Sequence, residues 1–173
     1  LVHFEQYLKI ERGLSVNSII SYSLDVQALM IFHKENDSCT PLSCSKEDVQ
    51  RFLYEEAKEV EARSQARRIS GLKSFFNFLI FEGYRENSPI DLIESPKLGR
   101  KLPTVLSLSE IERLLDCIDL SHAQGHRNRA IIETLYGSGL RVSELVDLKI
   151  SDLYFDENMM LINGKGDKQR LVP

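Results

Sequence analysis

The sequence LYGSGLRVSEL, from Leu135 to Leu145, joins the end of one predicted helix to the start of the next. Gly137 and Gly139 interrupt the first helix, because glycine is a poor helix former and easily leaves helical geometry. Arg141 then stands at the start of the following helix, where a positive charge opposes the helix dipole. A bound anion would reverse that effect, and a guanidinium fork matches two oxygens of one phosphate. Glu144, one turn further on, can hold the guanidinium in place; an ordinary surface ion pair is the alternative.

A second basic stretch, NGKGDKQR from Asn163 to Arg170, lies close to the end of the chain. Around it the apolar period changes from 3.6 to about 2, which indicates strands. Gly166 and Asp167 suit a two-residue type II′ turn, in which Asn163 faces Arg170 and Lys165 faces Lys168. Crowded like charges on one ribbon face favour an anionic partner, although a solvated hairpin tip is the plain alternative. The predicted strands are Leu153–Phe155, Met159–Lys165 and Lys168–Val172.

The first part of the chain has apolar residues at helical spacing, which predicts four helices. Ser15 is placed to cap the second helix, and Ser45 with Asp48 forms a capping box for the third. Ser64 is predicted to open the fourth helix, and Gly83 to end it. The apolar stripe of the fourth helix is Ile69, Leu72, Phe76, Leu79 and Ile80.

The stretch from Glu86 to Pro103 has prolines at regular intervals with Ser, Gly and Lys between them, which is typical of an extended linker. Ser107 and Glu110 then form a new capping box. We therefore expect a helical domain over residues 1–93, a linker over 94–106 and a second domain over 107–173.

The fourth predicted helix carries four basic residues and no acid between residues 63 and 73. Arg63, Arg67 and Ser70 share a face opposite the apolar stripe, which suits contacts with phosphates and base edges. A solvated polar face is the alternative. The formal net charge of −4 sums over all faces, so it does not exclude a local anion-binding surface.

Together these stretches resemble the tyrosine-type site-specific recombinases of the phage integrase family, in particular the bacterial Xer type. The resemblance also includes Gly13-Leu14-Ser15 with Asn17 and Tyr22, Ser64–Arg67, Ser95-Pro96-Lys97 and Gly164–Pro173. It implies a mainly α fold with a small β part: a four-helix, SAM-like core-binding domain, followed by the start of an α+β catalytic domain.

The resemblance also implies roles for single residues. Arg141 corresponds to the first catalytic arginine, Lys165 to the hairpin lysine and Glu144 to a supporting acid. The nucleophilic tyrosine is expected beyond Pro173, so these residues alone are expected to be inactive; Tyr136 is expected in the core. The expected DNA-binding residues are Asn17, Tyr22, Arg63, Arg67, Arg68, Ser70, Lys73, Lys168 and Arg170.

The implied reaction is strand cleavage and rejoining through a 3′-phosphotyrosyl intermediate, without metal or cofactor, in a homo- or hetero-tetramer on two duplex sites. We expect a cytoplasmic, nucleoid-associated protein, since no apolar run approaches about 18 residues and the odd number of cysteines fits a reducing compartment. The three cysteines form no zinc pattern, so no metal site is expected. Two alternatives are a non-catalytic, integrase-like DNA-binding regulator and an all-α protein-interaction domain. The target site, the partner recombinase and the choice between chromosome dimer resolution and mobile-element integration stay open.

Overall fold

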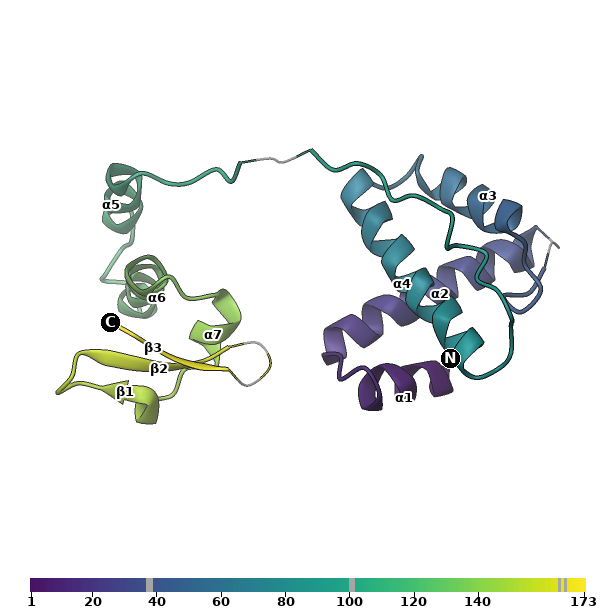
Figure 1. The fold of residues 1–173 in the computed structure, drawn as a ribbon. Helices are drawn as coiled ribbons and strands as arrows, with labels where there is room; N and C mark the ends of the chain where they lie inside the picture. The colour runs from purple at the N-terminus through teal and green to yellow at the C-terminus, as the bar shows by residue number, and fades with distance from the viewer. Residues whose placement is uncertain (37–38, 100–101, 165, 167) are drawn as a thin grey trace. The chain divides into compact units, whose positions relative to one another are not determined.

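A computed structural model describes residues 1–36, 39–99, 102–164, 166 and 168–173. The chain forms two compact units, Leu1–Lys101 and Leu102–Pro173 (Figure 1). The first is helical, and the second combines helices with one small sheet. The predicted fold class, mainly α with a small β part, is therefore confirmed.

The first unit consists of four helices around one apolar core. The helices are α1 (Val2–Ile10), α2 (Val16–Glu35), α3 (Lys46–Glu56) and α4 (Ala62–Phe81). Each contributes fully buried side chains, among them Phe4, Leu29, Phe52, Leu72 and Phe76. The predicted inward stripe of α4 is confirmed as buried, apart from the half-buried Ile80.

The predicted caps of α2 and α3 are present, whereas the fourth helix does not begin where it was predicted to. Ser15 accepts a hydrogen bond from the Ser18 backbone N–H, and the Ser45–Asp48 capping box is formed. The prediction that Ser64 opens the fourth helix was wrong, because α4 begins at Ala62 with Glu61 at its N-cap. Glu, Ala and Arg are good helix formers, so the helix extends back over this segment.

The second unit contains α5 (Leu108–Asp116), α6 (Gly125–Ser138), α7 (Val142–Val146) and the 3₁₀ turn η1 (Ile150–Asp152). Strands β1 (Leu153–Tyr154), β2 (Met159–Asn163) and β3 (Gln169–Val172) form an antiparallel meander. The predicted capping box between Ser107 and Glu110 is present. Helix α6 runs through Gly137 and ends before Gly139, which has a left-handed φ of 60°.

The predicted hairpin register was wrong by one residue. Asn163 pairs with Gln169, and Ile162 pairs with Arg170, instead of Asn163 with Arg170. A shift of one residue moves a side chain to the other face of the ribbon. Arg170 therefore shares a face with the buried Ile162. Lys165 and Asp167 lie outside the described residues.

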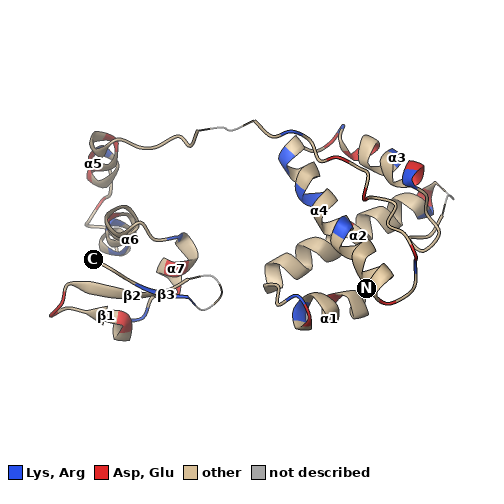
Figure 2. Ribbon diagram, in the orientation of Figure 1, with Lys and Arg blue, Asp and Glu red and all other residues tan. Residues whose placement is uncertain are grey.

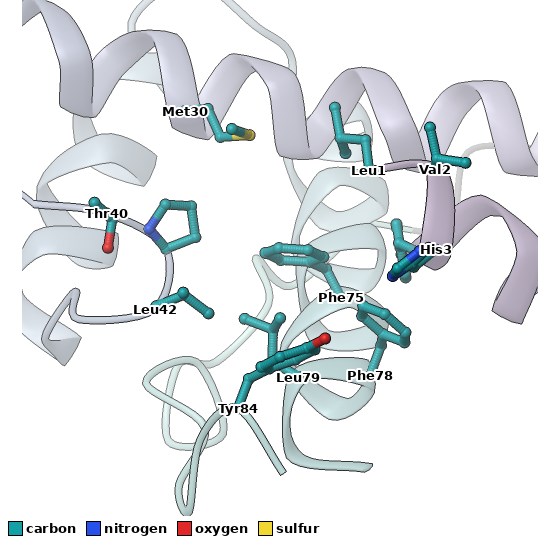
Figure 3. Close-up of a pocket in the computed structure, with 12 residues that line it drawn as sticks. Leu1, Val2, His3, Met30, Thr40, Leu42, Phe75, Phe78, Leu79 and Tyr84 are labelled. Atoms are coloured by element: carbon teal, nitrogen blue, oxygen red, sulfur yellow. The ribbon is translucent and has the colours of Figure 1, made fainter. Parts of the chain in front are cut away.

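An apolar pocket of about 580 Å³ opens in the first unit, between the start of α1, the C-terminal half of α4 and the loop after α2 (Figure 3). No acidic side chain is among the described residues that line it. Its wall consists of Leu1, Val2, His3, Phe4, Met30, Thr40, Pro41, Leu42, Phe75, Phe78, Leu79 and Tyr84.

Within the described parts of the chain, no helix combines the length and the apolar character that crossing a membrane requires.

Tyr136, expected in the core, has half of its surface exposed on α6. It lies near the C-terminal end of that helix, where the apolar stripe gives way to glycines.

Candidate nucleic-acid interface

The basic residues of α4 lie mainly in its N-terminal half (Figure 2). The Arg67 guanidinium donates to both carboxylate oxygens of Asp25 on α2, from Nη1 to Oδ2 at 2.7 Å and from Nη2 to Oδ1 at 2.5 Å. Arg68 Nε lies 3.4 Å from the same carboxylate, and Arg68 also pairs with Glu56 of α3. Two of the predicted DNA-binding arginines, Arg67 and Arg68, are therefore held by acids of α2 and α3.

Asp25 is the centre of this arrangement, because its side chain is only 1% exposed. A buried carboxylate is tolerated only when it is paired, and a two-bond fork is the strongest form of pairing. The carboxylate raises the pKa of Arg67 above its ordinary value, mainly through the hydrogen bonds. The Arg67 side chain nevertheless stays 45% exposed, so its outer edge can meet a ligand.

Gly71 leaves the space that this carboxylate occupies. A Cβ atom at residue 71 would lie 2.3 Å from Asp25 Oδ2 and 3.2 Å from Tyr22 Cδ1. Glycine is therefore required at this point of α4 by the close approach of α2.

The other residues expected to bind nucleic acid differ in exposure. Asn17, Arg63 and Ser70 are exposed, Lys73 is half buried, and the Ser70 hydroxyl donates to the Ala66 carbonyl at 3.1 Å. Tyr22 is half buried and packs against the core of the first unit. Of the residues expected to bind nucleic acid on these two helices, the structure thus presents Asn17, Arg63, Arg67 and Ser70 to solvent.

The second unit brings two arginines onto one carboxylate. Glu144, whose side chain is 4% exposed, accepts from the Arg141 backbone N–H at 2.8 Å and from Arg141 Nη1 at 2.7 Å. Arg170 of β3 donates to both oxygens of the same carboxylate, each at 2.8 Å. Four donors therefore converge on a single buried acid.

These donors hold the pKa of the Glu144 carboxyl far below its ordinary value. The Arg170 hydrogen bonds contribute most, the Arg141 backbone N–H comes next, and burial opposes both. The acid stays ionised at neutral pH. Its neighbour Arg141 keeps a side chain that is 70% exposed.

The sequence predicts the contact between Arg141 and Glu144, which the structure contains, but not the contact between Arg170 and Glu144. Asp25 was not predicted either, although an acid next to the inward stripe of Tyr22, Val26 and Leu29 was a visible signal. Lys168 is exposed, whereas Arg170 turns toward Glu144. Lys165 lies outside the described residues, so the structure gives no position for it.

No group of three or more His, Cys, Asp or Glu side chains able to hold a metal ion occurs among the described residues. Burial raises the pKa of the Cys44 thiol to about 11, so this cysteine is a poor nucleophile near neutral pH.

Two family models match this chain. The model for the phage integrase N-terminal SAM-like domain matches residues 1–83, and the phage integrase family model matches residues 104–173. The chain belongs to the phage integrase family. This membership confirms the resemblance found in the sequence, including the four-helix, SAM-like first domain.

The curated relatives of this integrase-family chain include proteins named tyrosine recombinase XerD. Those of Listeria innocua and Oceanobacillus iheyensis are 38% and 41% identical over 172 and 174 residues. In both cases the match covers 98% of the chain and 58% of the relative. The chain therefore spans less than two thirds of the length of these relatives.

Solved structures of the family share the fold. A XerH site-specific recombinase bound to its palindromic difH substrate matches with a TM-score of 0.71 and 25% identity, over 98% of this chain and 52% of that chain. A lambda integrase tetramer bound to a Holliday junction matches with a TM-score of 0.76 at 19% identity, over 99% of this chain and 48% of that chain.

Proposed function

We propose that the complete protein is a site-specific recombinase that cleaves and rejoins duplex DNA, and that residues 1–173 supply DNA binding and part of the active site. The observation that carries this proposal is the exposed Arg141 guanidinium, whose Nη1 donates to the buried Glu144 carboxylate. A cation held in this way is preorganised for an anion that arrives from solvent.

Double-stranded DNA is the proposed substrate. The XerH relative is described as bound to difH in a post-cleavage complex, and the lambda integrase relative as a tetramer on a Holliday junction. For this protein we propose a homo- or hetero-tetramer on two recombination sites, acting in the cytoplasm at the nucleoid. The helical unit contacts the duplex through Asn17, Tyr22, Arg63, Arg67, Arg68, Ser70 and Lys73.

The proposed chemistry is phosphoryl transfer through a covalent intermediate. A tyrosine hydroxyl outside residues 1–173 attacks the scissile phosphate, forming a bond from its oxygen to phosphorus, while the bond to the 5′ oxygen breaks. Arg141 neutralises the non-bridging oxygens as charge develops. Lys165 gives a proton to the departing 5′ oxygen. Cationic side chains neutralise the phosphate, so the reaction needs neither metal nor cofactor.

The decisive experiment compares two variants of the complete protein on two substrates. Arg141→Ala should lower the cleavage rate by on the order of 10²–10³-fold while site binding stays largely intact. Lys165→Ala should slow cleavage of an ordinary strand. A substrate with sulfur in place of the 5′ bridging oxygen should restore the Lys165→Ala rate, because a thiolate leaves without a proton.

The sulfur substrate should leave Arg141→Ala impaired, because Arg141 acts on the other oxygens. If sulfur restores neither variant or both equally, Lys165 is not the general acid. If the wild-type complete protein binds DNA but never forms a covalent adduct, it is a DNA-binding regulator instead.

Residues 1–173 alone should bind duplex DNA weakly and form no covalent adduct. Their affinity should fall steeply with salt, because cations that meet phosphates release counterions. Arg67→Lys keeps a charge near Asp25 but loses the guanidinium fork, and it should cost about 1–3 kcal/mol if Arg67 reads a base edge. An affinity that ignores both salt and Arg67→Lys would contradict this interface.

A further inference from the structure

Arg170 stands apart from the other basic residues near the hairpin. The family resemblance implies that Arg170 contacts DNA. Its Nη1 and Nη2, however, both donate to Glu144, and its side chain is only 38% exposed. The pairing of Arg170 with Ile162 directs it to the buried face of the ribbon. Its guanidinium is thus already engaged within the protein.

We propose that Arg170 is a positioning residue for Arg141: it occupies both oxygens of Glu144, so that Arg141 keeps its outer nitrogens available for the scissile phosphate. This inference rests on the proposed function. It replaces the assignment of Arg170 as a DNA contact.

The hydrogen bonds support this role. An arginine side chain has five N–H donors, and the Arg141 side chain gives Glu144 a bond from Nη1 only. A buried carboxylate without Arg170 would lose two of its four donors, and unpaired buried acceptors are costly. Glu144 would then draw the second Nη of Arg141 to itself and turn the guanidinium away from solvent.

The charges point the same way. Arg141 and Arg170 together carry two positive charges against the single negative charge of Glu144, which leaves the cluster with a net charge of +1. Without Arg170 the Arg141–Glu144 pair would be neutral. A positive cluster favours a phosphate, and a neutral pair does so much less.

Gly164 lies beside this ion-pair cluster. A Cβ atom there would lie 3.2 Å from the Lys168 carbonyl oxygen, 3.4 Å from Arg170 Nη1 and 3.5 Å from Glu144 Oε1, so the tight contact is with the neighbouring strand and the contacts with the cluster are ordinary ones. Arg170 links β3 to Glu144 of α7. Lys165 follows Gly164 in the sequence, and Arg141 immediately precedes α7. The ion-pair cluster of Glu144, Arg141 and Arg170 therefore lies next to both proposed catalytic residues along the chain.

The test uses the complete protein with Arg170→Ala and Arg170→Lys. At saturating DNA, both variants should slow cleavage by on the order of 10–100-fold, as loss of a supporting shell typically does. Lysine should fail to rescue, because a single ammonium cannot give two parallel bonds to a carboxylate. The slope of DNA affinity against salt should stay unchanged, because Arg170 itself meets no phosphate.

A direct phosphate contact would give the opposite pattern. The salt slope would fall by about one unit in Arg170→Ala, and lysine would restore much of the affinity. That result would overturn the proposal. So would equal slowing by Arg170→Ala in the wild-type and the Arg141→Lys backgrounds, because a residue that acts through Arg141 must lose its effect when Arg141 is changed.

A nitrogen-15 NMR measurement on the Arg141 guanidinium separates this inference from the proposed function. In Arg170→Ala, Glu144 should engage both Nη groups of Arg141 and slow the rotation of the guanidinium about its Nε–Cζ bond. Unchanged Arg141 signals would overturn the positioning role. A wild-type protein that never cleaves DNA would overturn the proposed function and leave this readout intact.

Discussion

Two buried acids, Asp25 and Glu144, each contact two arginines, Arg67 and Arg68 in the first case and Arg141 and Arg170 in the second. Each has a side chain that is nearly inaccessible to solvent and accepts a two-bond fork from an arginine on another element. Because an unpaired buried charge is strongly unfavourable, each acid fixes the direction of its partners. Four of the arginines that the sequence marks as ligand contacts are thus oriented by acids that are almost inaccessible to solvent.

Gly71 should be intolerant of a methyl group, although it lies within a helix. Alanine normally stabilises a helix interior by about 1 kcal/mol over glycine. Here the added Cβ would meet Asp25 Oδ2 at 2.3 Å, on a short side chain held by Arg67. We expect Gly71→Ala to lower the free energy of unfolding by about 1–3 kcal/mol, as overpacking does, measured by urea denaturation.

Gly137→Ala is the matched control. Gly137 also lies in a helix, and a Cβ atom there would meet nothing within 4 Å. Alanine should therefore stabilise the second unit by about 0.5 kcal/mol. If Gly71→Ala stabilised the protein as well, the close approach of Asp25 would be contradicted.

The stability of the second unit should depend on pH through Glu144. In the unfolded chain this carboxyl takes up a proton as the pH falls below its ordinary pKa of 4.5, whereas the folded protein keeps it ionised. The unfolded state then binds more protons than the folded state. The contribution of Glu144 to the stability of the folded protein is therefore complete above about pH 4.5 and declines as the pH falls. Urea midpoints measured between pH 3 and pH 7 should decline less in Glu144→Gln than in the wild type; identical acid dependence would contradict the pairing.

At the scale of the elements, local signals set three of the helix starts. Ser15, Ser45 and Ser107 each precede a helix with the expected cap. The hairpin register had no comparable local signal, since Gly166 and Asp167 suit several turns. In the pairing that forms, Arg170 shares the face of the buried Ile162, where it donates to both oxygens of Glu144.

The Ser45 cap should be measurable by itself. Its hydroxyl accepts from the Asp48 backbone N–H at 3.2 Å, while Asp48 accepts from the Ser45 backbone N–H at 2.9 Å. Ser45→Ala should cost about 1 kcal/mol of unfolding free energy. Ser45→Gly should cost only about a few tenths of a kcal/mol, because glycine is itself tolerated at N-caps. Equal losses for Ser45→Ala and Ser45→Gly in thermal denaturation would rule out a capping effect.

At the scale of the whole molecule, the chain is two compact units, and the family models match residues 1–83 and 104–173. The segment between the matches carries prolines and no helix or strand among its described residues. Each unit has its own buried side chains, from Phe4 in the first to Ile162 in the second.

Limited proteolysis should cut first between Glu94 and Pro103. Trypsin can cut after Lys97, which is exposed and outside any helix or strand. Proteases prefer such extended segments because they must unfold the chain locally to cleave it. Early fragments on a gel, identified by mass, should therefore end near residue 97; first cuts inside α4, after Arg67 or Lys73, would argue against two independent bodies.

The sequence by itself determined the helices, their caps, the fold class and the family, because these depend on local periodicity and on motifs such as LYGSGLRVSEL. It also indicated the contact of Arg141 with Glu144, since residues three apart on a helix are neighbours. Only the tertiary structure decided that Asp25 holds Arg67 across 42 residues and that Arg170 holds Glu144 across 26. Such pairs depend on which faces the helices and strands bury against each other, and no spacing along the chain encodes that distance.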